Sequence, residues 1–182
     1  MDTQKLEEYK RQIQESQDRY NQSIEEKFRS GRKRCPHCGQ TLVFKERNCE
    51  GPDLPEYEEE QERLEAEHTK ISLAMDSLKE RIVEEMLDDP EMKDLVCTHT
   101  ITFFYNEDHC DGNYELDKEL DKAFPLVLTD SESSQGFAYC PASIVEEVVA
   151  WLKDGRAVEA RYYENDRDMC SINWKAAGLT TA

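Results

Sequence analysis

The chain has 182 residues, of which 37% are hydrophobic and 35% are charged, and its formal net charge is −18 at pH 7. Such acidity argues against a general binder of nucleic acid or anionic membranes, because phosphate recognition depends on Lys and Arg side chains that release counterions. No segment approaches the roughly 20 apolar residues of a membrane span, and the N-terminus lacks the apolar core of a signal peptide, so we expect a cytoplasmic protein in a reducing compartment with no membrane contact.

The charge is distributed unevenly along the chain. Residues 1–34 carry nine basic and seven acidic side chains, whereas residues 50–182 carry 12 basic and 33 acidic side chains. We call the cationic residues within positions 27–47 the basic patch: Lys27, Arg29, Arg32, Lys33, Arg34, Lys45 and Arg47. One interpretation is that these cations only stabilise the C-terminal end of a helix. The other is that they also bind a partner. We expect a protein partner, and at most a weak, salt-sensitive contact with nucleic acid.

The first predicted element is a helix that ends at Gly31. Its apolar stripe recurs at intervals of seven and is narrow: Leu6, Ile13, Tyr20 and Lys27, with Tyr9 beside the first of them. Because no Gly or Pro occurs in residues 1–30, one helix of about 26 residues is expected.

A second long helix is predicted between the breakers near Pro55 and Pro90. Two rows of residues at intervals of seven form its apolar seam: Tyr57, Leu64, Ile71 and Leu78, with His68, Met75 and Ile82. Neither helix can bury its stripe alone, so we expect an antiparallel, coiled-coil-like hairpin over residues 1–90 whose tip is residues 32–54. A homodimer formed through the helices is the alternative.

The predicted tip contains the sequence CPHCG, residues 35–39. Two cysteines separated by two residues and followed by Gly place both sulfurs on one side of a tight turn, as a zinc ion requires. Over these five residues the chain resembles the knuckle shared by zinc ribbons and rubredoxin-like sites. We therefore predict zinc as the cofactor, with Cys35 and Cys38 as ligands and Cys49 and His37 as candidates to complete the set. A redox motif and a metal-free turn are the alternatives.

The chain has no second Cys-x-x-Cys. A zinc site in the tip is therefore completed from a distant part of the chain or from a second molecule. The latter geometry is similar to that of the zinc hook of the coiled-coil DNA-repair ATPases, in which two hairpin tips share one metal, although the helices here are much shorter. A homodimer whose two chains share one zinc ion is therefore a further alternative.

Residues 91–182 are predicted to form an acidic α+β domain, a small mixed β-sheet with one packed helix. Five short segments rich in β-branched and aromatic residues indicate strands: 96–105, 125–129, 136–140, 158–163 and 169–174. One helix is expected between the third and fourth strands, with Ser143 as its cap and Gly155 as its end.

Two further groups of residues in this domain are candidates for metal binding or catalysis. Cys97 and His99, with His109 and Cys110, form a sensible zinc set, although strand cysteines are more often core residues. Cys140 lies where a predicted strand meets a helix N-terminus, which favours a thiolate, and a buried core thiol is the alternative.

These patterns predict a non-enzymatic zinc-binding interaction or regulatory protein. Its basic tip and its acidic C-terminal domain would engage protein partners. One alternative is an acidic inhibitor that mimics nucleic acid and occupies the basic groove of another protein. The other is a cysteine-dependent enzyme centred on Cys140, which would need an exposed thiol of low pKa close to a histidine.

Overall fold

The computed structural model describes residues 3–31, 55–105, 114–132 and 135–179. The chain forms two compact units, one of Lys10–Leu78 and one that combines Met1–Tyr9 with Lys79–Ala182. Four α-helices and two small antiparallel sheets make up the described residues, which confirms the predicted α+β class. The predicted zinc knuckle in the tip lies outside the described residues. A domain boundary at residue 90 stays a prediction.

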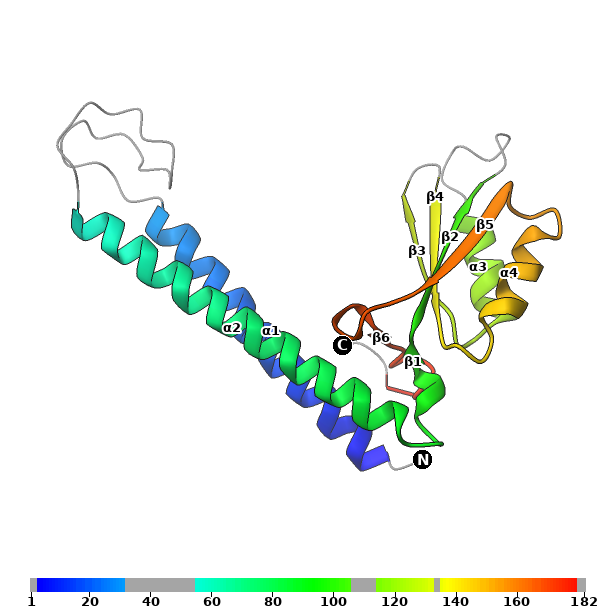
Figure 1. Ribbon diagram of the computed structural model, residues 1–182, viewed down its shortest axis with the longest axis horizontal. Coiled ribbons are helices and arrows are strands. Elements are labelled where there is room, and N and C mark those ends of the chain that lie inside the picture. The colour runs from blue at the N-terminus through cyan, green and yellow to red at the C-terminus, as the bar shows by residue number, and fades with distance from the viewer. Residues whose placement is uncertain (1–2, 32–54, 106–113, 133–134, 180–182) are drawn as a thin grey trace. The chain divides into compact units, whose positions relative to one another are not determined.

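The two longest helices pack against each other (Figure 1). They are α1 (Thr3–Gly31) and α2 (Pro55–Leu87). In the Lys10–Leu78 unit, Ser23 Oγ lies 2.7 Å from His68 Nδ1, and Lys27 Nζ lies 2.6 Å from Glu65 Oε2. Lys27 follows Ser23 in α1, whereas its partner Glu65 precedes His68 in α2. The two helices are therefore antiparallel. The predicted packing of these helices is therefore confirmed.

The predicted heptad positions line the seam between these helices. In the Lys10–Leu78 unit the seam residues are buried or half-buried: Ile13, Tyr20, Ser23, Leu64, His68, Ile71, Met75 and Leu78. Two helices cover only a narrow stripe of each other, so apolar residues beside the stripe remain exposed. Ile24 is 44% exposed and Phe28 is 56% exposed for this reason.

A four-stranded antiparallel sheet forms the centre of the other unit (Figure 1). Its strands are β2 (His99–Phe104), β3 (Leu128–Glu132), β4 (Gln135–Cys140) and β5 (Glu159–Glu164), in the order β3-β4-β2-β5. A separate two-stranded sheet pairs β1 (Val96–Cys97) with β6 (Ser171–Ile172), next to the short 3₁₀ turns η1 (Lys93–Leu95) and η3 (Arg167–Met169). Every strand pair is antiparallel, so the prediction of a mixed sheet was wrong.

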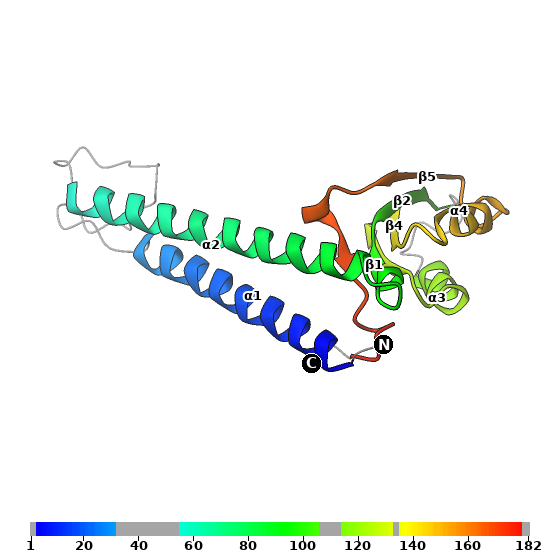
Figure 2. The same ribbon diagram turned by 60° about the horizontal axis from the view of Figure 1, so that its bottom comes forward.

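Two helices, α3 (Tyr114–Ala123) and α4 (Val145–Lys153), cover one face of the four-stranded sheet (Figures 1 and 2). The order β2-α3-β3-β4-α4-β5 is the split β-α-β arrangement of ferredoxin-like folds. The prediction of one packed helix was wrong, because α3 was not expected. Among the residues of α3 whose burial is described, the buried apolar ones are Leu116 and Leu120, a stripe too short to mark a helix within a polar sequence.

The ends of α4 differ in part from the prediction. Ser143 does not cap the helix: the N-cap residue is Ile144, and the Ser143 hydroxyl instead donates to Asp94 Oδ1 at 2.9 Å. At the other end α4 stops at Lys153 as expected, and Gly155 takes a φ of 76°, a left-handed conformation that favours glycine.

The main core lies between the sheet and its two helices. Its most buried members alternate along the strands and meet the apolar faces of the helices: Ile101, Phe103, Leu120, Ala138, Val148 and Leu152. Gly136 pairs with Phe103 across β4 and β2, and the Phe103 ring occupies the space that a Cβ at Gly136 would need. The large ring thus depends on a glycine opposite it.

A second, smaller core joins the ends of the long helices to β1. Its fully buried residues are Leu6, Ile82, Val83, Met86, Met92 and Val96. At its edge the Tyr9 hydroxyl donates a short hydrogen bond to Glu85 Oε2, and Lys5 lies over the Tyr9 ring.

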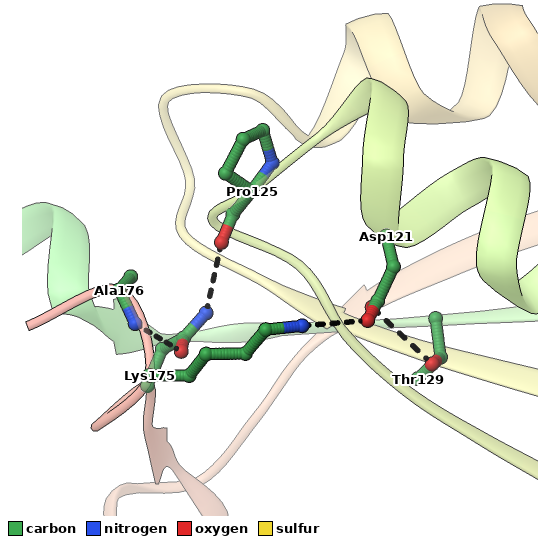
Figure 3. Close-up of polar contacts among 6 residues, drawn as sticks. Asp121, Pro125, Thr129, Lys175 and Ala176 are labelled. Atoms are coloured by element: carbon green, nitrogen blue, oxygen red, sulfur yellow. Dashed lines mark hydrogen bonds and ion pairs between the residues drawn. The ribbon is translucent and has the colours of Figure 1, made fainter. Parts of the chain in front are cut away.

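The C-terminal segment is held by a buried amide. Asn173 is fully buried; its Nδ2 donates to the Pro125 carbonyl at 3.4 Å, and its Oδ1 accepts from the Ala176 backbone N–H at 2.9 Å. Beside it Lys175 forms a 2.8 Å ion pair with Asp121 of α3 (Figure 3). The buried amide and the ion pair together attach this segment to the α3–β3 connection.

Candidate interaction surface

The predicted zinc ligands and most of the basic patch lie outside the described residues. They are Cys35, His37, Cys38, Cys49, Arg32, Lys33, Arg34, Lys45 and Arg47. Two members of the patch are described. Lys27 is paired with Glu65 at 2.6 Å, and Arg29 with Glu25 at 3.1 Å. Arg29 is largely exposed, so its pairing is weak and leaves the guanidinium accessible to a partner.

The second predicted cysteine–histidine set is only partly described. Cys97 is fully buried, and burial raises the pKa of its thiol to about 12. His99 instead lies against Thr98 Oγ1, at 3.0 Å from its Nδ1, and against the Tyr162 ring. His109 and Cys110 lie outside the described residues. In the part of the chain that the structure describes, no three His, Cys, Asp or Glu side chains come together to hold a metal.

Cys140 is a core residue at the end of β4. Its side chain is fully buried, and burial raises the pKa of the thiol to about 12. Its partner across the strands is His99, yet a nucleophile needs an accessible thiol and a lowered pKa. This environment favours the structural alternative for Cys140.

The four-stranded sheet presents a second face, opposite α3 and α4. Side chains alternate between the two faces of a strand, so the residues between the core positions point to this other face. We call these residues the open face: Leu128 and Asp130 of β3; Gln135, Phe137 and Tyr139 of β4; Thr100, Thr102 and Phe104 of β2; Glu159, Arg161 and Tyr163 of β5. Four aromatic rings lie on adjacent strands within it.

The strand register places these rings in rows across the sheet. Thr100 lies between Tyr139 on β4 and Tyr163 on β5. Tyr163 is 55% exposed and Phe104 is 41% exposed, while the rings on the central strand β4 are half-buried among their neighbours. The cation of the open face, Arg161, is already paired with Glu159 at 2.6 Å. The surface is therefore aromatic, and its charged residues, Asp130, Glu159 and Arg161, give it no net positive charge.

A polar pocket lies beyond the end of β5. Its volume is about 290 Å³, and it is lined by Thr98, Glu164, Asn165, Asp166, Arg167 and Cys170. The Asn165 backbone N–H donates to the Thr98 carbonyl at 2.8 Å, which extends the β2–β5 pairing by one step. Asn165 Oδ1 accepts a 2.7 Å hydrogen bond from the Thr100 hydroxyl. The other atom of this amide, Nδ2, is buried and has no hydrogen-bond partner among the described residues.

The open face was not predicted, although part of its signal lies in the sequence. In GFAYC, residues 136–140, large rings alternate with small core residues, which places Phe137 and Tyr139 on one face of a strand. The pocket had no such signal, because it depends on where the chain turns after β5.

No helix within the described residues is both long enough and apolar enough to cross a membrane. Comparisons of the chain with protein-family models, with curated proteins and with solved structures find no significant match. Functional conclusions therefore rest on the residues of this chain.

Proposed function

We propose that this chain is a non-enzymatic, zinc-binding interaction protein with a regulatory role. In this proposal the Cys35–Cys38 knuckle holds the shape of a basic tip, and the α+β domain engages a protein partner through the open face. Zinc fits the donors at the knuckle, because two thiolates at this spacing converge on one metal.

The observation that carries this proposal is the aromatic character of the open face. Helices cover the opposite face of the sheet, whereas on the open face Phe104 and Tyr163 are about half exposed. Aromatic side chains are enriched in the centres of protein interfaces because they bury a large area at low conformational cost. Two exposed rings beside two half-buried ones are a surface suited to a partner.

The chemistry of the described residues supports a binding role over catalysis. Cys97 and Cys140 are buried thiols with raised pKa values. The polar pocket beyond β5 combines Glu164, Asp166 and Arg167 at the surface, without a histidine among its lining residues. A nucleic-acid-mimicking role for the acidic surface stays a prediction.

Affinity purification of the tagged full chain from its own cells tests the proposal. Phe104→Leu combined with Tyr163→Leu removes two rings of the open face. The matched control is Tyr162→Leu, because Tyr162 lies on the same strand, is 46% exposed and points to the opposite face. We expect at least one protein that purifies with the wild type and with the control to be lost from the double variant, while thermal unfolding shows that all three are folded. An identical set of proteins from all three would contradict a role for the open face.

A further inference from the structure

The strand β5 is an outer strand of the four-stranded sheet, and its second half is exposed along that edge. β5 pairs with β2 alone, so its other side has no neighbouring strand among the described residues (Figure 2). The residues from Arg161 to Glu164 are all exposed, Tyr162 by 46% and Tyr163 by 55%. Ala160 is only 1% exposed, so the accessible part of the edge begins at Arg161. An unpaired edge with exposed rings is a site where another strand can add.

The hydrogen-bond pattern of the β2–β5 pair determines which backbone groups point outward. The Asn165 N–H donates to the Thr98 carbonyl at 2.8 Å, and hydrogen-bonded residues alternate along an antiparallel pair. Tyr163 therefore bonds with β2, whereas the N–H and C=O groups of Tyr162 and Glu164 point away from it. Among the described residues, no hydrogen bond to these outward groups occurs. The exposed edge thus offers donors and acceptors at the spacing of a further strand.

These outward groups are complementary to the same groups on a second copy of the chain. When two β5 strands run antiparallel with Tyr163 opposite its counterpart, Tyr162 of each strand lies opposite Glu164 of the other. Both of these pairs are of the hydrogen-bonded kind, so they use every outward group. Registers centred on Arg161 or Tyr162 would need the buried Ala160, and a register centred on Glu164 would place two carboxylates opposite each other. The strand therefore favours the register centred on Tyr163.

The side chains agree with this register. Tyr163 and its counterpart form a non-hydrogen-bonded pair, in which opposite side chains are closest, and aromatic pairs stabilise such positions. On the other face of the sheet, Tyr162 lies opposite Glu164, whose carboxylate can accept a hydrogen bond from the phenol. Arg161 lies opposite Asn165, so no two like charges are directly opposed within the exposed half of the strand.

We propose that two copies of the chain associate through their β5 edges in this register. A two-fold axis perpendicular to the sheet relates the copies, so the two four-stranded sheets join into one antiparallel sheet. Because this axis leaves each face of the sheet on its own side, the two open faces form one continuous surface. The inference goes beyond the proposed function, since it concerns the edge of the sheet and a second copy of the chain.

The charge of the chain makes this association weak and dependent on salt. Each copy has a formal net charge of −18, and the contact is short, so repulsion between the copies opposes pairing. Salt screens this repulsion. The association constant should therefore rise by about three- to tenfold between about 0.05 M and about 0.5 M salt, whereas an attraction between opposite charges would weaken over the same range.

Sedimentation equilibrium of the full chain, at concentrations up to about 1 mM, tests the proposal. Cys35→Ser combined with Cys38→Ser serves as the background, because it excludes a dimer that shares zinc. Tyr162→Pro removes an outward N–H without removing a bond to β2, and edge strands tolerate proline at such positions. The matched control is Tyr162→Leu, which removes the same ring but keeps the N–H. We expect Tyr162→Pro to weaken dimerisation by at least about tenfold and Tyr162→Leu by less than about threefold.

A cysteine cross-link tests the register without proline. In the same background, Tyr163→Cys places two thiols in a non-hydrogen-bonded pair whose Cα atoms are about 4.5 Å apart, a separation that a disulfide spans. Oxidised glutathione should convert this variant into a covalent dimer linked through position 163. Arg161→Cys is the control, because it lies on the same face of β5 but opposite Asn165 rather than its counterpart. Peptide mapping by mass spectrometry identifies the linked positions.

Three results would overturn the proposal: a background chain that stays monomeric at about 1 mM, dimerisation that Tyr162→Pro leaves unchanged, or equal cross-linking of Tyr163→Cys and Arg161→Cys. Dimerisation that survives the proline would assign the contact to the long helices instead. If thermal unfolding shows that Tyr162→Pro is not folded, the cross-linking comparison decides. The purification experiment can fail independently, because it detects other proteins rather than a second copy of this chain.

Discussion

The hydroxyl of Thr100 donates a 2.7 Å hydrogen bond to Oδ1 of Asn165, and this bond joins the central strand β2 to the residue that follows β5. Thr100 is nearly fully buried, although it belongs to the open face. The bond fixes the Asn165 amide, whose Nδ2 is buried without a hydrogen-bond partner among the described residues.

Thr100→Val should reduce stability. The change keeps the shape of the side chain but leaves Asn165 Oδ1 without its donor, which should lower the free energy of unfolding by about 1–2 kcal/mol. Urea unfolding measures the effect. Thr102→Val is the control, since its hydroxyl has no hydrogen-bond partner among the described residues; equal losses in both variants would contradict the role of Thr100.

Gly136→Ala should destabilise the sheet through the Phe103 ring. A Cβ at Gly136 meets the end of that buried ring, so the ring must move within a packed core, at a cost of about 2–3 kcal/mol. Urea unfolding of Gly136→Ala in the wild type and in a Phe103→Leu background checks this cause. The cost should fall in the Phe103→Leu background, where the ring is absent. The same cost in both backgrounds would show that the ring is not responsible.

Tyr9→Phe should destabilise the protein in a pH-dependent manner. The hydrogen bond from the Tyr9 hydroxyl, and then one from Arg81, lower the pKa of Glu85 from its ordinary value of 4.5. A lowered carboxyl pKa contributes stability above the unfolded pKa, and this contribution is lost as the pH falls through the folded pKa. At pH 7 the variant should therefore be less stable by about 1 kcal/mol, and the difference should shrink below pH 4.5. Chemical unfolding from pH 3 to pH 7 measures it; a difference that does not change with pH would contradict this cause.

Cys97 and Cys140 should resist alkylation in the folded protein. Burial raises the pKa of each thiol to about 12, so the reactive thiolate is scarce at pH 8. Relative to a thiol of ordinary pKa, the thiolate fraction falls by about a thousandfold, before access is considered. Mass spectrometry of iodoacetamide-treated peptides, with and without urea, measures both sites. Rapid native alkylation of Cys140 would restore the cysteine-dependent enzyme as the better interpretation.

Zinc should remain with the full chain when it is purified under reducing conditions. Native mass spectrometry should find one zinc per chain, and Cys35→Ser combined with Cys38→Ser should remove it. Half a zinc per chain within a dimer would place the site between two copies. A wild type without zinc would contradict the proposed knuckle.

The sequence predicted the elements whose periodic patterns are long or strongly apolar. Heptad spacing identified the seam of α1 and α2, and the run from Ile144 to Leu152 identified α4, because burial of a stripe depends on a repeat that a single sequence displays. The helix α3 escaped prediction because the described part of its apolar stripe is short and consists of Leu116 and Leu120.

Features that depend on strand order were beyond the sequence. Tyr139 and Tyr163 are 24 positions apart, and only the placement of β2 between β4 and β5 brings both beside Thr100. The Ser143 cap failed for a related reason, since its hydroxyl is directed to Asp94 of η1, to which it donates, instead of accepting from a backbone N–H of α4. Long-range pairing decides such contacts, whereas local patterns decide the elements.

The most direct test of the account is to compare what binds to the open face with what binds to the opposite face. Affinity purification compares the wild type with Phe104→Leu combined with Tyr163→Leu, and with Tyr162→Leu on the opposite face. The account predicts that a protein partner is lost from the double variant alone. Retention of every partner by all three folded proteins would contradict the open face as the binding surface.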